Sequence, residues 1–298
     1  MKVAIVHYWL NGMRGGEKVL ENLCSLYPNA HIYTHVIDEN KISDIIKKHK
    51  IKTTFINKLP FSKILYKYYL FLMPLALKFL NLNSYDLVIT SESGPSKGIS
   101  KNTNAIHVCY CHSPMRYIWD MSNLYYENFN FLEKIGYNLF VKYLRFWDVR
   151  STHNIDLIIA NSNFVKDRIK RYWNKDAIVI NPTIDINNFN NSSDKGYYIV
   201  LSEFVAYKKV DLVIRAFNKT GKKLIIVGDG SLKNEYINLS KNNIEFTGHV
   251  SNNKKNKLLS ECKALVVPGI EDFGIVPLEA MACGKPVIAF NGGGAIEY

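Results

Sequence analysis

Two glutamates that lie eight positions apart are the residues of this sequence best suited to chemistry. Glu271 and Glu279 belong to the segment 268–289, which runs from the end of an expected strand through a glycine-containing turn into an expected helix. Phe273 and Gly274 open that helix, so one carboxylate lies at its mouth and the other about a turn inside. The exposed N–H groups of a helix start bind phosphate, and carboxylates accept hydrogen bonds from sugar hydroxyls. The pair therefore predicts a sugar-nucleotide site, with plain capping of a solvated helix as the alternative.

Four more residues have types that suit a phosphate or sugar ligand. Lys208 begins an expected helix after a strand, where it either contacts phosphate or is one solvated charge among many. His112 precedes Pro114 by two positions and is either a site residue or a loop histidine. Gly15 and Gly16 lie in the first strand-to-helix turn, where glycine lets a backbone approach a ligand closely, although a plain turn explains them nearly as well.

Metal and disulfide chemistry are not indicated by the residue types. No two aspartates are separated by one position, so the sequence holds no Asp-x-Asp metal pair. The five cysteines are scattered, and Cys109 and Cys111 lack the second pair that a structural zinc site needs. The chain opens directly on an apolar strand pattern, without the successive basic and apolar regions of an export signal. We therefore expect reduced thiols, a cytoplasmic protein and no metal.

The elements that must position these residues alternate along the chain. Short runs rich in Val and Ile are separated by helix-length segments, which indicates βα units and parallel sheets. Strands are expected over 3–7, 31–35, 87–90, 105–109, 157–160 and 177–180, and then over 197–201, 223–227, 243–246, 264–267 and 286–289. Helices of the second series are expected over 209–217, 252–262 and 276–283.

The composition changes between the two series. Residues 181–195 are polar and turn-forming, so we expect one domain over 1–183, a linker over 184–195 and a second domain over 196–298. The predicted fold class is α/β, with two doubly wound parallel-sheet domains. Ligands of such sheets bind outside the carboxyl ends of the strands, so the site is expected in the cleft between the domains.

The segment 268–289 resembles the E-x7-E signature of retaining glycosyltransferases of family 4. Further stretches match that family in order and spacing: 1–20 with Gly15-Gly16-Glu17, 109–120, 207–211, 227–230 and 246–250. The resemblance covers nearly the whole chain. It implies the GT-B fold, in which two Rossmann-like domains face each other across a cleft, the first on the acceptor side and the second binding the nucleotide sugar.

The resemblance implies a role for each candidate in the second domain. Glu279 would hold the ribose hydroxyls of the nucleotide, and Glu271 would hold a hydroxyl of the donor sugar. Lys208 would neutralise the diphosphate. Backbone groups around the start of the helix would assist it, namely those of Phe273, Gly274 and Ile275.

In the first domain, the resemblance implies that Gly15 and Gly16 admit the phosphates and the transferring sugar. His112 would hydrogen-bond the donor sugar near the reacting centre. The implied enzyme is a retaining, metal-independent hexosyltransferase without a covalent nucleophile, acting in bacterial surface-polysaccharide assembly such as lipopolysaccharide biosynthesis. It would need no cofactor beyond its substrate, a nucleoside-diphosphate sugar for which GDP-mannose is the leading candidate, and its acceptor would be a glycan or a lipid-linked glycan.

Two positions depart from the family pattern. Glu203 stands where members usually carry an arginine that pairs with Lys208 on the diphosphate. Either Lys208 and the helix dipole suffice, with Arg14 or Arg116 assisting, or diphosphate binding is weakened. The family also continues beyond residues 292–298, so we expect an incomplete second domain of lower stability. Both departures favour the alternative of a catalytically weak homologue that acts as a binding or scaffold partner in the same pathway.

The net charge of +12 is concentrated in one stretch. Eight lysines face one aspartate between Lys41 and Lys67, so these residues carry +7. An uncharged run follows over 68–77, which is too short to span a bilayer and contains Pro74. Residues 41–80 are therefore either an element that contacts an anionic membrane surface, on the inner face of the plasma membrane, or a core segment with a solvated lysine face. The stretch lacks a recognisable nucleic-acid module, so no nucleic-acid partner is expected.

Overall fold

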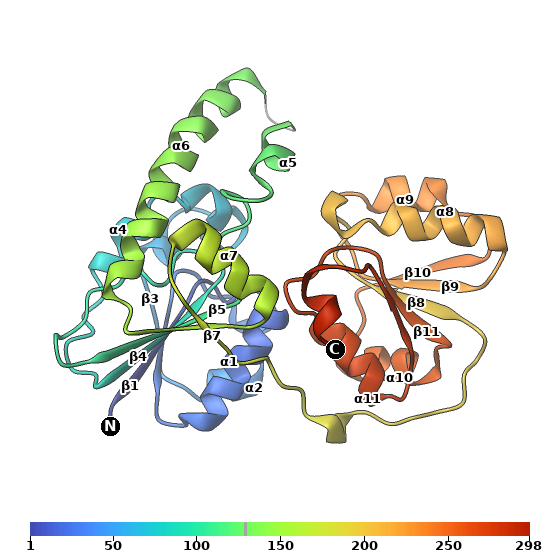
Figure 1. Ribbon diagram of the computed structural model, residues 1–298, viewed down its shortest axis with the longest axis horizontal. Coiled ribbons are helices and arrows are strands. Elements are labelled where there is room, and N and C mark those ends of the chain that lie inside the picture. Colours follow the sequence, from blue (N-terminus) through green and yellow to red (C-terminus); the bar gives the residue numbers. More distant parts are fainter. Residues whose placement is uncertain (128–129) are drawn as a thin grey trace. The chain divides into compact units, whose positions relative to one another are not determined.

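Each half of the chain folds into a parallel β-sheet with helices on both of its faces (Figure 1). The computed structural model describes residues 1–127 and 130–298. The chain divides into two compact units, Met1–Asn181 and Pro182–Tyr298, which we call unit 1 and unit 2. The division falls at the start of the polar segment 181–195.

Unit 1 contains a seven-stranded sheet in the order β3-β2-β1-β4-β5-β6-β7. Its strands are β1 (Val3–His7), β2 (His31–Thr34), β3 (Ile51–Thr53), β4 (Leu87–Glu92), β5 (Ile106–Cys111), β6 (Leu157–Ala160) and β7 (Ile178–Val179). Each neighbouring pair among them is parallel. Because β2 and β3 lie on one side of β1 and β4 on the other, the chain reverses its direction of winding between β1 and β4.

Helices of several lengths connect these strands. The α-helices are α1 (Gly15–Leu26), α2 (Asp44–Lys47), α3 (Ser62–Leu65), α4 (Met73–Lys78), α5 (Ser122–Glu127), α6 (Phe131–Arg150) and α7 (Asn163–Trp173). The 3₁₀ turns are η1 (Glu39–Lys41), η2 (Phe55–Lys58), η3 (Tyr66–Tyr69) and η4 (Ser151–Asn154). The six strands expected in this half are confirmed within two residues at each end, whereas β3 escaped notice because Ile51 and Thr53 flank a lysine in a lysine-rich stretch.

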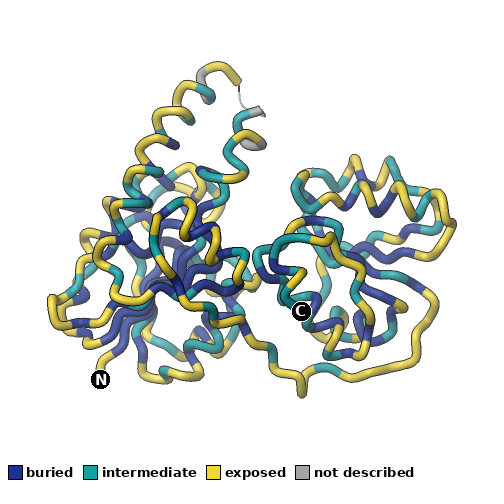
Figure 2. Tube along the Cα trace, viewed as in Figure 1, coloured by how far each residue is buried: buried dark blue, intermediate teal, exposed yellow. Residues whose placement is uncertain are grey.

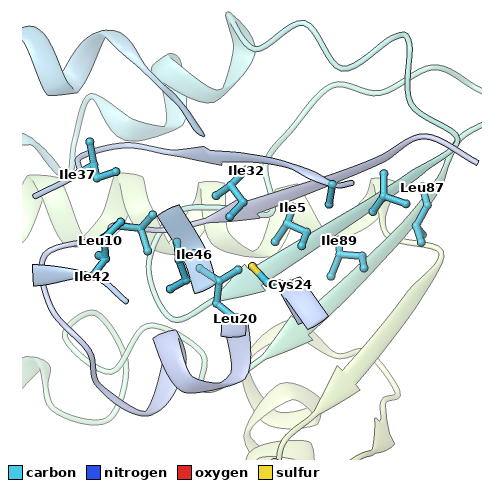
Figure 3. Packing of buried hydrophobic residues seen from close by; sticks show 12 residues of the cluster. Ile5, Leu10, Leu20, Cys24, Ile32, Ile37, Ile42, Ile46, Leu87 and Ile89 are labelled. Atoms are coloured by element: carbon cyan, nitrogen blue, oxygen red, sulfur yellow. The ribbon is translucent and has the colours of Figure 1, made fainter. Parts of the chain in front are cut away.

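The core of unit 1 explains why its first strand was recognisable. All five residues of β1 are buried, as expected for a parallel strand covered on both faces. Figure 3 shows Ile5, Ile32 and Ile89 of three adjacent strands packed against Leu20 and Cys24 of α1. Complete burial of each such aliphatic side chain contributes roughly 1.5–3 kcal/mol.

Two buried histidines in unit 1 are held in their neutral form. His107 Nδ1 donates to the carbonyl oxygen of Asn154 at 3.0 Å, so its Nε2 accepts from Thr90 Oγ1 at 3.0 Å. His35 Nε2 donates to the carbonyl oxygen of Pro95 at 2.8 Å. Burial lowers the pKa of both His35 and His107 to about 4.

We therefore expect unit 1 to lose stability in mild acid. An unfolded histidine binds a proton near pH 6.5, whereas these folded side chains do so only near pH 4. Between about pH 6.5 and 4 the unfolded state binds more protons, so the free energy of unfolding falls, by up to about 3 kcal/mol per histidine. Urea unfolding followed across this range measures the effect. The double variant His35→Gln/His107→Asn should show a shallower slope, and an unchanged slope would contradict the assignment.

The lysine-rich stretch and the apolar run after it divide between surface and core. All eight lysines between Lys41 and Lys67 are exposed. In the following run, Leu70 and Met73 are buried in a cluster, whereas Tyr68 and Phe71 are exposed. None of the helices in the described part of the chain is long and apolar enough to cross a membrane.

Unit 2 contains a five-stranded parallel sheet in the order β10-β9-β8-β11-β12. Its strands are β8 (Tyr198–Leu201), β9 (Leu224–Val227), β10 (Ile244–Gly248), β11 (Ala264–Val267) and β12 (Val287–Ala289). Its helices are α8 (Val210–Thr220), α9 (Lys233–Leu239), α10 (Asn252–Glu261) and α11 (Ile275–Ala282), with 3₁₀ turns η5 (Ile186–Asn188), η6 (Ala206–Lys208) and η7 (Gly293–Glu297). The expected strands and helices of this half are confirmed within three residues.

Winding in unit 2 reverses between β8 and β11, which are neighbours in the sheet. The loop after β9 approaches the loop after β8 closely at this edge. Gly228 has a φ of +139°, and a Cβ there would lie 1.8 Å from the carbonyl oxygen of Ser202. Gly228 is thus required by packing between two loops at the carboxyl edge of the sheet.

Candidate functional site

A chain of hydrogen bonds crosses the carboxyl edge of the unit 1 sheet at the point where the winding reverses. His7 ends β1, Ser91 lies near the end of β4, and His112 follows β5. Ser91 Oγ lies 2.9 Å from His7 Nδ1 and 2.8 Å from His112 Nε2. One hydroxyl carries one proton, so Ser91 can donate to at most one of the two imidazoles and accepts from the other when that ring is protonated on the facing nitrogen. His112 is therefore held by the sheet edge and is not a freely rotating loop residue.

Glu17 lies between His7 and the glycine turn. Its Oε1 lies 3.7 Å from His7 Nε2, and its Oε2 accepts a hydrogen bond from the backbone N–H of Arg14 at 3.0 Å. Burial by itself would raise the pKa of Glu17, but the nearby His7 ring and backbone N–H groups lower it overall. The start of α1 and the His112 ring are thus linked through Glu17, His7 and Ser91.

Close packing of the Tyr8 side chain within unit 1 requires glycine at position 16. A Cβ at Gly16 would lie 2.1 Å from the hydroxyl oxygen of Tyr8. The Tyr8 ring in turn meets the His112 ring edge-on, with 6.3 Å between centroids. From the sequence we expected that Gly15 and Gly16 leave room for a ligand. The structure places both glycines at the start of α1, where the absence of a side chain at Gly16 leaves room for the Tyr8 hydroxyl.

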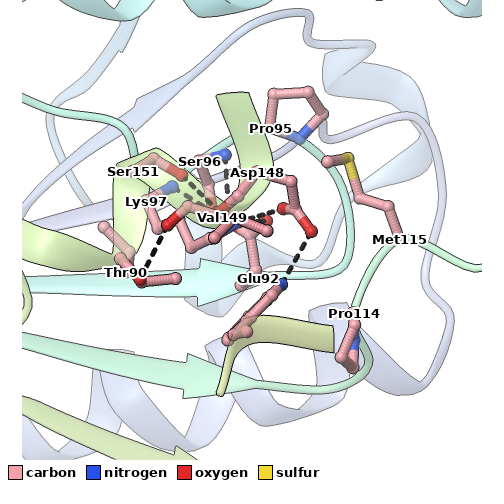
Figure 4. Close-up of polar contacts among 12 residues, drawn as sticks. Thr90, Glu92, Pro95, Ser96, Lys97, Pro114, Met115, Asp148, Val149 and Ser151 are labelled. Carbon is pink, nitrogen blue, oxygen red and sulfur yellow. Dashed lines mark hydrogen bonds and ion pairs between the residues drawn. The ribbon is translucent and has the colours of Figure 1, made fainter. Parts of the chain in front are cut away.

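A buried charge network fixes the end of β4 (Figure 4). Lys97 is fully buried, and its Nζ lies 3.1 Å from Glu92 Oε1 and also pairs with Asp148 of α6. Asp148 Oδ2 accepts hydrogen bonds from the indole N–H groups of Trp119, at 2.8 Å, and Trp173, at 2.7 Å. Sequence reasoning missed this network because Asp148 and the two tryptophans are far from Glu92 and Lys97 in the chain.

The network carries two carboxylates for one ammonium group. Burial would lower the pKa of Lys97, but Asp148 and Glu92 raise it overall, whereas burial raises the pKa of Glu92. The backbone carbonyl of Glu92 accepts from the N–H of His112 at 2.8 Å. The network therefore anchors the strand end on which His112 rests.

In unit 2, the structure brings Lys208 and Glu271 into direct contact. Lys208 Nζ lies 2.6 Å from Glu271 Oε1, and both side chains are about one-fifth exposed. Lys208 follows β8 and Glu271 follows β11, the two neighbouring strands between which the winding reverses. Gly269 permits this approach, since a Cβ there would lie 2.9 Å from the Cα of Lys208. The sequence singled out both residues but did not predict that they pair.

Glu279 has a partner that sequence reasoning missed. It is buried on α11 and pairs with Lys255 of α10. Lys255 Nζ also lies 5.9 Å from the centre of the Phe189 ring. The sequence gives little indication that Lys255 is a partner of Glu279, because this lysine belongs to a run of polar residues typical of a solvated helix face.

The turn between the two glutamates is tightly held. Gly274 caps α11 with a φ of +103°, and Ile275 is the first helical residue. Phe273 is buried and meets the Tyr298 ring edge-on at 5.9 Å between centroids. The N–H of Gly294 donates to the carbonyl oxygen of Glu271 at 2.8 Å. The first turn of α11 therefore begins at a rigid glycine turn next to the Lys208–Glu271 pair.

Each unit thus gathers its candidate residues at the carboxyl edge of its own sheet. Unit 2 offers an ammonium group, two carboxylates and the N-terminus of α11, a set that suits a ligand with phosphate and hydroxyl groups. Unit 1 offers a buried, hydrogen-bonded imidazole beside a glycine turn. In doubly wound sheets, the edge where the winding reverses is where ligands bind.

Comparison with known families shows which family the chain belongs to. Residues 13–188 match the family described as Glycosyltransferase Family 4, and residues 183–298 match Glycosyl transferases group 1. The chain belongs to glycosyltransferase family 4. The expected family is therefore confirmed, and the two matches overlap over 183–188, shortly after the division between the units.

Two curated relatives of this family-4 chain illustrate the range of similarity. An uncharacterized glycosyltransferase, MJ1178 of Methanocaldococcus jannaschii, is 34% identical over 158 residues, which cover 51% of this chain and 45% of that protein. The alpha-1,3/1,6-mannosyltransferase ALG2 of Saccharomyces cerevisiae is 26% identical, with 99% of this chain and 70% of that protein covered. The chain thus aligns with less than half of the length of the first relative.

Solved structures of similar shape confirm the GT-B fold with two Rossmann-like domains. Anabaena Alr3699/HepE, crystallised in complex with UDP, superposes with a TM-score of 0.69 at 17% identity, covering 100% of this chain and 82% of that one. The sucrose-phosphate synthase of Thermosynechococcus elongatus superposes with a TM-score of 0.66 at 16% identity, covering 99% and 82%. At these identities the likeness concerns the fold alone.

Proposed function

We propose that this family-4 chain is a retaining glycosyltransferase that moves a mannose-type sugar from a nucleoside-diphosphate donor to a glycan or lipid-linked acceptor in bacterial surface-polysaccharide biosynthesis. The contact between Lys208 and Glu271, which precedes the first residue of α11 by four positions, carries the proposal. It places a cation for the diphosphate beside a carboxylate for the sugar. The mannosyl part is supported by the ALG2 relatives, which are named mannosyltransferases.

The donor is proposed to be a nucleoside-diphosphate sugar, with guanine as the leading candidate for its base. Alr3699/HepE has been crystallised with UDP and with UDP-glucose, which supports the nucleoside-diphosphate sugar as the donor class. Glu279 would accept the ribose hydroxyls and Glu271 a hydroxyl of the sugar. Binding of the diphosphate would need no metal ion, because the ammonium group of Lys208 and the start of α11 supply positive charge at the phosphates.

The reaction breaks the bond between the anomeric carbon and the β-phosphate oxygen. The acceptor oxygen forms its bond to that carbon on the same face, and the acceptor proton passes to the departing phosphate oxygen. Negative charge therefore grows on the diphosphate in the transition state. A fixed cation and helix dipole at that position lower the barrier. His112 would hydrogen-bond the sugar, held in place by Ser91.

The acceptor is proposed to be presented at a membrane. Residues 41–80 would contact the anionic inner face of the plasma membrane, supported by the eight exposed lysines of that segment. The protein would then act as a cytoplasmic, peripheral enzyme.

Release of nucleoside diphosphate from a panel of GDP- and UDP-sugars tests the proposed function. The ribose takes no part in bond breaking, so Glu279→Ala should mainly raise the KM for the donor. The sugar changes in the transition state, so Glu271→Ala should lower kcat, by about 10²–10³-fold. Glu235→Ala, an exposed glutamate on α9, is the matched control.

Two outcomes would contradict this assignment. If neither Glu271→Ala nor Glu279→Ala changed the rate of nucleoside-diphosphate release, the two glutamates would not form the donor site. Nucleotide binding without any sugar transfer would instead favour the alternative, a catalytically weak homologue that acts as a binding partner.

A further inference from the structure

Helix α6 has one face in the core and another that nothing in the described part of unit 1 covers. Val141 and Leu144 are buried in a cluster, with Phe140 and Trp147 packed against it. Figure 1 shows α6 and α5 projecting from the rest of unit 1, and Figure 2 shows that much of the outer part of α6 is exposed.

Five large apolar side chains form a row along the uncovered face. We call them the α6 stripe: Phe131, Ile135, Leu139, Tyr143 and Phe146. Their spacing of three or four residues places them on one side of the helix. Phe131 is 76% exposed, Leu139 68% and Phe146 67%. Monomeric proteins rarely leave so many large apolar groups contiguous in water, so the stripe indicates an interaction surface.

The charges along the stripe are positive. Lys142 lies three residues after Leu139 and four before Phe146, and Arg150 lies four after Phe146, so both share the exposed face. Both side chains are exposed. The one acidic side chain described on α6, Asp148, is buried in the Lys97 network and adds no exposed negative charge.

The inner face of α6 rests on the lysine-rich part of unit 1. Phe140 packs against a cluster that contains Tyr66 and Met73. Beside this cluster, Phe61 and Ile64 are 75% and 77% exposed, in the segment that carries exposed lysines. The inner face of α6 therefore packs, through Phe140, on the segment that carries the most basic stretch of the chain.

We propose that the α6 stripe docks on an anionic phospholipid bilayer, with its apolar side chains among the acyl chains and its cations at the headgroups. Interleaved aromatic and basic side chains are the chemistry of helices that lie in the membrane interface. A second copy of this chain would bring Lys142 and Arg150 against the same charges, which disfavours self-association through this face. The inference rests on the proposed function in one respect: docking would bring the enzyme to a lipid-linked acceptor. Binding to the bilayer does not itself require turnover.

Co-sedimentation of the full chain with vesicles tests the proposal. We expect binding to vesicles of phosphatidylglycerol and phosphatidylcholine, weaker binding to phosphatidylcholine alone, and weaker binding at high salt. The triple variant Phe131→Ser/Leu139→Ser/Phe146→Ser should lose about a hundredfold in vesicle affinity, since it removes three side chains from the acyl region.

The matched control removes apolar side chains of similar exposure elsewhere. Leu26, Ile186 and Leu212 are 72%, 67% and 60% exposed, and their serine triple variant should bind vesicles as the natural chain does. If the α6 triple variant fails to fold, Lys142→Glu, a single exposed change, should still weaken binding to anionic vesicles about threefold or more.

Three results would overturn the proposal. These are no vesicle binding by the natural chain, equal loss in both triple variants, or self-association that the α6 variant abolishes in the absence of lipid. Donor turnover without vesicle binding would refute the docking and leave the proposed function standing. Vesicle binding without turnover on any donor would do the reverse.

Discussion

Replacing Lys208 by methionine is expected to lower the turnover of the sugar-nucleotide donor by about 10²–10³-fold, a loss typical of removing one group that stabilises transition-state charge. An ammonium group has three N–H donors, so Lys208 can keep its contact with Glu271, 2.6 Å away, and bind a phosphate oxygen at the same time. Methionine preserves the aliphatic stem but leaves the Glu271 carboxylate facing the departing diphosphate. Donor turnover under saturating and limiting substrate measures the effect.

The loss should be specific to this lysine. Lys219→Met, an exposed lysine at the end of α8, should leave turnover unchanged. In the double variant Lys208→Met/Glu271→Gln, the losses should combine to less than their product, because the two residues act as a pair. Turnover of Lys208→Met within about threefold of the natural chain would refute the role of Lys208 at the diphosphate.

Replacing Lys97 by methionine is expected to destabilise unit 1 by about 3–5 kcal/mol. The substitution leaves two fully buried carboxylates, those of Glu92 and Asp148, without their shared cation. Backbone N–H groups still hold Glu92 and two indoles still hold Asp148, so we expect the lower part of this range. Urea unfolding at neutral pH measures the change.

A second substitution tests whether charge is the cause. Glu92→Gln added to Lys97→Met removes one uncompensated negative charge and should restore part of the lost stability. Lys48→Met, an exposed lysine in unit 1, should change stability by less than about 0.5 kcal/mol. If Lys97→Met is as stable as Lys48→Met, the network does not stabilise the end of β4 as described.

The pattern of residue types was enough to predict the fold class and the positions of most strands. Parallel strands buried on both faces appear as short aliphatic runs, so residues such as Ile5 and Ile226 marked their strands without any tertiary information. The strand β3 was missed because its three residues include an exposed lysine and none is buried, so only its pairing with β2 marks it as a strand.

Site residues that act through a local pattern were also recognisable. Gly274 and Ile275 stand at a helix start, a feature that the order of residue types encodes directly. Glu271 and Glu279 were recognisable by their spacing around that start. Their roles on a donor remain predictions, and so do those of Lys208 and His112.

Which of these residues contact one another could be seen only in the folded chain. The contacts of Lys208 with Glu271, of Lys255 with Glu279 and of Lys97 with Asp148 join residues 24 to 63 positions apart. Such partners depend on which strands and helices are neighbours, and no local pattern carries that information. The exposed face of α6 was hidden for the same reason: its stripe and its inner face are both apolar, and only packing shows which of the two is covered.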